Sequence, residues 1–296
     1  MSMQTCRRGV VAAAWCAALM AAVASGASAA PVTPWKPAGI SSPQFESHAA
    51  FDPRTGDFYF VRSSPDFSGW RILVSHCGRN REGWSAPVPP AFAGDGVEAD
   101  PYFTRDGDSL YFISTRSTDG VKRKDLDLWR VDRNAAGAWG TPRRLPEPLN
   151  STSTEWFPRP SPDGWLYFGS NRPGGLGGND IWRGRAGPDG AWRVENLGPG
   201  INTAGDEYEA LPSPDGDRLI VMADGDLYES RRDGDGWSAR VKLPPEVNSA
   251  GMEVGAVFSP SGRSILFSRD TKGPDSGEFF VYREGDPEPW PPQCPR

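Results

Sequence analysis

Residues 161–182 read SPDGWLYFGSNRPGGLGGNDIW, and this stretch decides the fold. It begins with Pro-Asp-Gly, in which proline presets the turn and glycine takes the position that needs a positive φ. The Leu-Tyr-Phe run that follows is strand material. The glycine-rich segment behind it links this strand to another, which begins at Asp-Ile-Trp. The stretch therefore predicts a β-hairpin followed by a third strand.

The same block occurs five times along the chain. Its turn glycine recurs as Gly56, Gly107, Gly164, Gly216 and Gly262. An apolar strand follows each glycine, then a third strand, and then a fourth that begins at tryptophan. Units of four strands repeated about every fifty residues are typical of β-propeller blades. We therefore predict an all-β fold, a five-bladed β-propeller of four-stranded blades, in a single domain over residues 30–296.

The predicted blades cover residues 46–92, 98–148, 155–202, 207–247 and 253–292. One further tryptophan-led strand, residues 34–40, precedes blade one. In a ring it belongs to blade five, and exposed sheet edges invite aggregation. We therefore expect residues 34–40 to pair with the strand around residues 279–282 and to close the ring.

The start of the chain has the features of a secretory signal peptide. Residues 1–29 carry Arg7 and Arg8, an apolar run over 10–23, and Ala-Ser-Ala at 27–29. Their removal leaves 30 basic and 38 acidic residues, a net charge of −8. An acidic surface argues against a nucleic-acid partner. We expect a periplasmic or secreted monomer that is not inserted in a membrane after signal cleavage.

The repeat resembles the WD-like, Pro-Asp type of β-propeller repeat. The resemblance rests on Glu-x-x-Pro-x-x-Ser-Pro-Asp-Gly, a strand, and Ser-Asn-Arg-Pro-Gly-Gly-x-Gly-Gly-Asn-Asp-Ile-Trp over residues 155–182, and on the Ile-Asn-Thr link at 201–203. Such repeats occur in the periplasmic TolB propeller and in envelope proteins that couple them to an OmpA-type peptidoglycan-binding domain. The resemblance implies a propeller that works in the cell envelope.

A glutamate stands at the start of the first strand of every repeat. The five are Glu46, Glu98, Glu155, Glu207 and Glu253. The first strand of a blade lines the axis, so these carboxylates would ring one mouth of the channel. They would bind a cation or a basic ligand, or each would pair with an arginine at the end of the second strand. Arginines stand there in four blades: Arg62, Arg116, Arg172 and Arg269.

Blade four lacks this arginine and carries Asp224 and Asp226 instead. We therefore expect uncompensated acidic charge there, and aromatic walls beside it that suit a basic or sugar-like ligand. The candidate ligand-binding residues at the channel mouth are Glu207, Glu209, Asp224, Asp226, Glu155, Glu98, Trp156 and Tyr208.

No catalytic residue, cofactor or metal site is predicted. Of the two histidines, His48 is expected to pack against the axis. The glycine-rich loop 174–178 precedes no helix that would bind phosphate, and its glycines are expected to allow a close approach of strands. We predict a non-enzymatic scaffold that binds an envelope protein or a small ligand at the loop face. The alternative is a glycosidase-like, carbohydrate-active propeller enzyme that uses acidic residues at the channel mouth.

Two cysteines, Cys77 and Cys294, remain after signal cleavage. If the tail from Trp290 lies over the junction of blades five and one, Cys294 approaches the end of the third strand of blade one. An oxidising compartment permits a disulfide between the two, and two free thiols are the other possibility.

Overall fold

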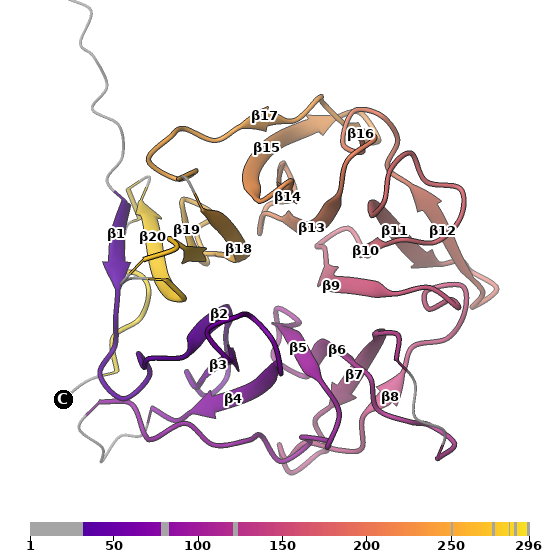
Figure 1. Ribbon diagram of the computed structural model, residues 1–296. Coiled ribbons are helices and arrows are strands. Elements are labelled where there is room, and N and C mark those ends of the chain that lie inside the picture. Colours follow the sequence, from indigo (N-terminus) through magenta and orange to yellow (C-terminus); the bar gives the residue numbers. More distant parts are fainter. Residues whose placement is uncertain are drawn as a thin grey trace, which may run out of the picture.

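The computed structural model describes residues 32–77, 83–120, 124–249, 251–273, 276–283, 285–286 and 289–294. These residues form five antiparallel sheets arranged around an axis, as Figure 1 shows in a view along it. The innermost strands are β2 (Phe45–Phe51), β5 (Glu98–Phe103), β9 (Glu155–Pro160), β13 (Glu207–Pro212) and β18 (Met252–Phe258). Each contacts the next around the ring. The prediction of a five-bladed β-propeller is confirmed.

The blades differ in their outer strands. Blade one adds β3 (Phe58–Ser63) and β4 (Arg71–Ser75), and its fourth strand is reduced to one bridge between Val74 and Val88. Blade two adds β6 (Ser109–Ser114), β7 (Asp127–Asp132) and β8 (Arg143–Arg144). Blade three adds β10 (Leu166–Ser170), β11 (Asp180–Ala186) and β12 (Trp192–Asn196). Blade four adds β14 (Arg218–Ala223), β15 (Asp226–Asp233), β16 (Gly236–Trp237) and β17 (Val241–Lys242), the last two both paired with β15.

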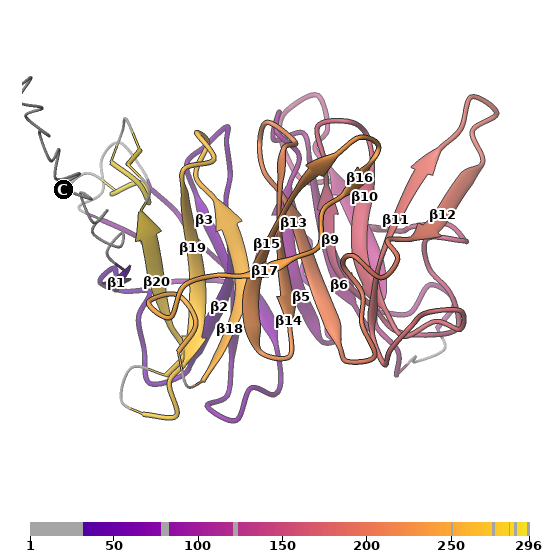
Figure 2. The ribbon, with the colours of Figure 1, turned by 90° about the horizontal axis from the view of Figure 1, so that it is seen from above.

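Blade five combines both ends of the chain. It consists of β18, β19 (Ser264–Asp270), β20 (Glu278–Arg283) and β1 (Val32–Trp35), which lies beside β20 in Figures 1 and 2. Val32 is opposite Tyr282 and Trp35 is opposite Phe279. Closure by an N-terminal strand is therefore confirmed, although the strand is 32–35 and residues 38–40 form a turn. The predicted signal peptide, residues 1–29, lies outside the described residues.

One backbone hydrogen bond joins every pair of neighbouring blades. The N–H of each blade glutamate donates to the carbonyl of the residue just before the third strand of the preceding blade, over 2.8 to 3.2 Å. The pairs are Glu46 with Gly277, Glu98 with Trp70, Glu155 with Leu126, Glu207 with Asn179, and Glu253 with Gly225. The junction of blades five and one thus uses the same bond as the other four.

The glycine-rich loop reinforces the joint between blades three and four. A Cβ on Gly177 would lie 2.1 Å from the carbonyl oxygen of Gly205, so no larger residue fits without a shift. Gly178 N–H donates to the same carbonyl at 3.0 Å, and Asn179 forms a parallel bridge with Asp206. The expected close approach of strands is present.

The C-terminal tail lies over the junction of blades five and one. Trp290 meets Phe51 with ring centroids 6.2 Å apart and packs against the cluster that contains Trp35 and Phe279. A disulfide joins Cys294 to Cys77, with Cα atoms 5.5 Å apart. Of the two possibilities that the sequence left open, a disulfide or two free thiols, the structure shows the disulfide. In the described part of the chain, no helix is long and apolar enough to cross a membrane.

Candidate functional site along the propeller axis

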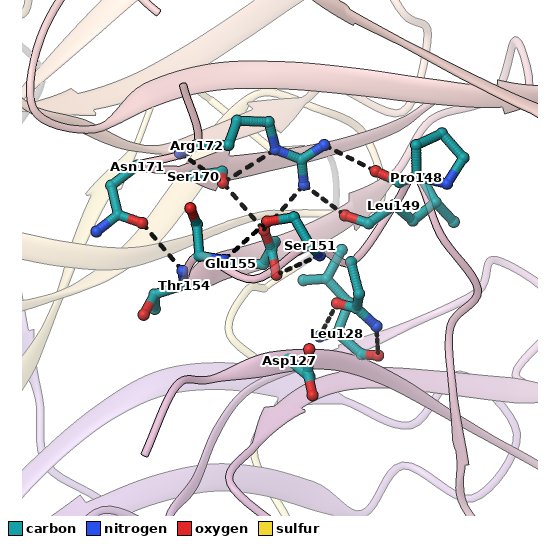
Figure 3. Close-up of polar contacts among 12 residues, drawn as sticks. Asp127, Leu128, Pro148, Leu149, Ser151, Thr154, Glu155, Ser170, Asn171 and Arg172 are labelled. Atoms are coloured by element: carbon teal, nitrogen blue, oxygen red, sulfur yellow. Dashed lines mark hydrogen bonds and ion pairs between the residues drawn. The ribbon is translucent and has the colours of Figure 1, made fainter. Parts of the chain in front are cut away.

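The five blade glutamates are buried and paired. In blade three, Arg172 Nη2 donates to Glu155 Oε1 at 2.9 Å and to the Leu149 carbonyl at 2.6 Å, and Ser151 Oγ donates to the same carboxylate at 2.6 Å (Figure 3). The predicted arginine partners are also found in blades one, two and five. The cross-strand interpretation is confirmed, and these carboxylates fasten the blades together.

The prediction that Glu207 has no arginine partner is wrong. Arg240 Nη1 donates to Glu207 Oε1 at 2.6 Å and to the Ile201 carbonyl at 2.5 Å. Strands β14 and β15 are joined by the two-residue turn Asp224-Gly225, with φ of 51° and 86°. Such a tight turn leaves no loop that would carry an arginine. The segment between β16 and β17 supplies the guanidinium to the same place instead.

The other acidic residues predicted for blade four are not brought together. Asp226 pairs with Lys242 Nζ at 2.7 Å, and Asp224 lies in the turn. Glu209 is buried further along the axis, where its Oε1 accepts from Arg159 Nε at 2.9 Å and Nη2 at 2.6 Å. Burial raises the pKa of Glu209, and the Arg159 guanidinium opposes this. Among the four acidic residues predicted for blade four, only Asp224 has no basic partner in the described part of the chain, so the expected patch of uncompensated charge is reduced to one carboxylate.

A β-bulge in each innermost strand turns side chains toward the axis. The pairing register shifts just after the blade glutamate in all five strands. Four bulge residues have left-handed φ: His48 at 54°, Asp100 at 56°, Phe157 at 46° and Gly255 at 66°. A left-handed conformation costs a non-glycine residue about 1–2 kcal/mol. Such strain persists only where the surroundings fix it, and often at functional positions.

His48 and Asp100 form a buried pair on the axis, and the packing of His48 agrees with the expectation. His48 Nε2 lies 3.1 Å from Asp100 Oδ1, His48 Nδ1 lies 2.6 Å from Ser47 Oγ, and Phe157 N–H donates to Asp100 Oδ2 at 2.9 Å. This Ser-His-Asp line differs from a catalytic triad because Ser47 is fully buried, so no substrate reaches its hydroxyl.

Burial sets the protonation of this pair. It lowers the pKa of His48 to about 3 and raises the pKa of Asp100 to about 7. The folded pair therefore holds one proton between these values. The unfolded pair also holds one proton, on the histidine, from roughly pH 3.9 to 6.5. Because the proton counts agree over that range, the pair adds almost no pH dependence to stability there.

Aromatic rings occupy the axis at the glutamate end. Phe67, from the loop between β3 and β4, stacks on His48 with centroids 6.1 Å apart. Edge-to-face contacts continue from Phe67 to Trp70, Trp156 and Tyr208 at 5.4, 6.0 and 6.2 Å. Trp156 and Tyr208 are half-buried, so neither ring is fully buried between blades. A ligand at this mouth stays a prediction. Arginine neutralises the blade glutamates of the rim expected for it, whereas Asp224 has no basic partner among the described residues.

A cavity of about 430 Å³ lies at the opposite end of the axis, and we call it the axial funnel. The ends of all five innermost strands and the turns behind them line it. Six prolines contribute: Pro53, Pro160, Pro162, Pro212, Pro214 and Pro260. Five aromatic residues contribute as well: Phe51, Tyr102, Phe103, Phe258 and Trp290. No carboxylate is among the described lining residues, so the funnel is an apolar cavity.

Sequence reasoning missed Asp100, Arg159 and the funnel. A signal for the first two exists in the aligned repeats. Positions two and four after the blade glutamate face the axis, and His48, Asp100, Arg159 and Glu209 occupy four of those ten positions. Charged residues on an innermost strand need partners, so reading these positions across blades would have grouped them. Described His, Cys, Asp and Glu residues form no cluster that would hold a metal ion.

The fold and its axial site define a five-bladed β-propeller with an apolar funnel at one end. No family model and no curated protein matches the sequence. A prolyl endopeptidase structure is 17% identical with a TM-score of 0.41, over 75% of this chain and 30% of that one. An alpha-L-arabinofuranosidase from Lactobacillus brevis is 12% identical with a TM-score of 0.47, over 81% and 90%. The periplasmic gluconolactonase of Pseudomonas aeruginosa is 14% identical with a TM-score of 0.44, over 81% and 76%. Likenesses this distant carry no conclusion about activity.

Proposed function

We propose that this chain is an exported, non-enzymatic β-propeller of the cell envelope that binds a small apolar ligand in the axial funnel. The observation that carries the proposal is the funnel itself, a preformed cavity whose walls come from all five blades. Ligand sites are usually concave, mostly apolar and largely preformed, with volumes from about 300 to 1,000 Å³. The export part rests on residues 1–29 and is supported by the Cys77–Cys294 disulfide, which suits an oxidising compartment.

The arrangement of carboxylates favours binding over glycoside hydrolysis. Hydrolysis of the usual kind needs two carboxyl groups that flank the scissile bond. The two axial carboxylates, Asp100 and Glu209, are 2% and 1% exposed and are held by His48 and Arg159. Each blade glutamate is buried and paired with an arginine. A glycosidase-like activity would need one of these networks to open, whereas ligand binding in the funnel needs no rearrangement.

Binding is tested with the uncharged dye N-phenyl-1-naphthylamine, whose fluorescence rises in apolar cavities. The wild-type protein is expected to bind one dye per chain. Pro162→Trp places a large ring in the funnel wall and is expected to abolish binding. Pro188→Trp is the matched control, because Pro188 begins the same Pro-Asp-Gly turn sequence, is exposed, and is not among the residues that line the funnel.

Loss of dye binding in Pro162→Trp alone, with unchanged melting temperatures in both variants, supports the funnel. Equal binding by the wild type and Pro162→Trp would refute the proposal. Release of 4-nitrophenol from aryl glycosides by the wild type, lost in Glu209→Gln, would establish the carbohydrate-active alternative instead.

A further inference from the structure

The geometry points to a small apolar carboxylate as the ligand of the axial funnel, with its anionic group paired to Arg105. This inference rests on the proposed function and specifies its ligand class. It starts from the hydrogen-bond donors that the funnel offers, because a bound anion needs donors or positive charge.

The backbone of the funnel wall offers almost no free donors. Its six prolines have no N–H group. In four blades, a threonine or serine that lines the funnel directly follows the innermost strand: Thr104, Ser161, Ser213 and Ser259. Each of these N–H groups donates to a carbonyl across its own hairpin at 2.8 to 2.9 Å. An anion bound in the funnel therefore cannot be held by main-chain groups at these positions.

The hydroxyl groups of the wall are also engaged. Those of Thr104, Ser161 and Ser213 donate to aspartates in the turns that follow, and that of Ser259 donates to Asp286 beyond β20. Three side-chain donors have no partner among the described lining residues: the guanidinium of Arg105, the hydroxyl of Tyr102 and the indole N–H of Trp290. Only the guanidinium of Arg105 is charged, and an anionic group on the ligand would pair with it.

Arg105 is the one charged residue among the described lining of the funnel. It is exposed and has no ion pair or hydrogen bond within the described part of the chain. Most arginines in the described part of the chain do have a carboxylate partner. The nearby Asp106 is committed elsewhere, because Thr104 Oγ1 and Asp108 N–H both donate to its Oδ1, at 2.6 and 3.0 Å. Charge complementarity therefore favours an anionic ligand.

The floor of the funnel excludes a cationic ligand. Arg159 lies behind Tyr102, with its guanidinium carbon 4.9 Å from the ring centroid, and it is 2% exposed. Glu209 neutralises Arg159, so the buried network offers no negative charge to a ligand above it. The turn aspartates are not among the described lining residues and already accept hydrogen bonds from the wall hydroxyls. An ammonium group inside the funnel would therefore lose its water shell without a carboxylate in the lining, which is unfavourable.

The experiment compares ligands with one apolar body and different heads. 2-Naphthylacetate, 2-naphthaleneethanol and 2-naphthylmethylammonium compete against N-phenyl-1-naphthylamine at 20 mM and 500 mM NaCl. The carboxylate is expected to bind about fivefold more tightly than the alcohol at low salt, as for an exposed ion pair. High salt should remove most of this difference. The ammonium compound should bind most weakly.

Arg105→Met is expected to lower the affinity for the carboxylate about fivefold and to leave the alcohol unchanged. Arg105→Lys should retain part of the preference, and Arg231→Met, an exposed arginine on β15, should change neither affinity. Equal affinities of wild type for the carboxylate and the alcohol, or equal losses for both in Arg105→Met, would overturn the inference. Because dye binding and its block by Pro162→Trp are read separately, that result would leave the proposed function standing.

Discussion

Replacing Arg240 by methionine tests whether Arg240 stabilises blade four by pairing with Glu207, as the arginines after the second strand stabilise the other blades. Glu207 is fully buried and Arg240 is 10% exposed, so the change leaves a buried carboxylate without its cation. Breaking a buried ion pair in this way costs about 3–5 kcal/mol. Thr203 still donates to Glu207 from its N–H at 3.0 Å and its hydroxyl at 2.7 Å, which favours the lower end of that range.

We therefore expect the free energy of unfolding to fall by about 3 kcal/mol in Arg240→Met. For a domain of this size that corresponds to a melting temperature about 6–12 °C lower. Methionine keeps an apolar stem over Tyr228, whose ring centroid lies 4.8 Å from the Arg240 guanidinium carbon, so the loss reports mainly on charge. Circular dichroism melts and urea titrations measure both quantities.

Three further variants serve as comparisons for Arg240→Met. Arg172→Met in blade three should lose the same amount of stability. Arg172 follows the second strand of its blade, whereas Arg240 lies between β16 and β17, but both pair with a buried blade glutamate. The double variant Glu207→Gln with Arg240→Met should recover much of the loss, because no buried charge is left unpaired. Arg231→Met, which is 71% exposed, should melt within about 1 °C of the wild type. A melting temperature of Arg240→Met within 2 °C of the wild type, or no recovery in the double variant, would refute the reasoning.

Three other changes probe the rest of the structure. Replacing Cys294 by serine should lower the free energy of unfolding by about 5 kcal/mol, because the bridge spans 217 residues. Guanidinium titration measures this loss, and an unchanged midpoint contradicts it. In Asp100→Asn, His48 stays unprotonated in the folded state while the unfolded chain gains a proton below roughly pH 6.5. Stability relative to the wild type should then fall as the pH is lowered from roughly 6.5 to 3.9, and parallel pH profiles would argue against the buried pair. Gly177→Ala should lower the free energy of unfolding by about 1–3 kcal/mol. Gly236→Ala, where there is room for a Cβ, should lower it by about 1 kcal/mol or less. Equal shifts of the two melting temperatures would contradict the close approach of Gly177 to Gly205.

The fold was predictable because each blade repeats its local signals. The turn glycine, the apolar strand and the starting glutamate recur at the same positions, so a single repeat unit defines the whole ring. Ring closure followed from one unmatched strand, and its partner β20 was identified by elimination. The exact limits of β1 were not predicted. The repeat pattern places a tryptophan at the start of each fourth strand, whereas Trp35 is the last residue of β1 that pairs with β20.

The candidate site was less predictable, for a spatial reason. Pairing was judged from residues near in sequence, so Arg240 was overlooked for Glu207. The axial cluster draws one residue from each of four blades, and Arg159 and Glu209 lie 50 residues apart. Prolines form much of the funnel wall, but in the sequence each of them indicates only a turn. Only the closed ring brings these five turns around one cavity, and no single repeat contains that information.

The disulfide has a mechanical consequence. With Cys77 joined to Cys294, the covalent path between the two ends of the described chain runs only through residues 32–77. A protein stretched from those ends would peel β1 from β20 and unravel blade one, extending by on the order of 150 Å. Blades two to four and strands β18, β19 and β20 of blade five lie inside the covalent loop and would carry no tension. Under force, blade one and strand β1 would therefore yield first, and the bridge protects the rest of the ring.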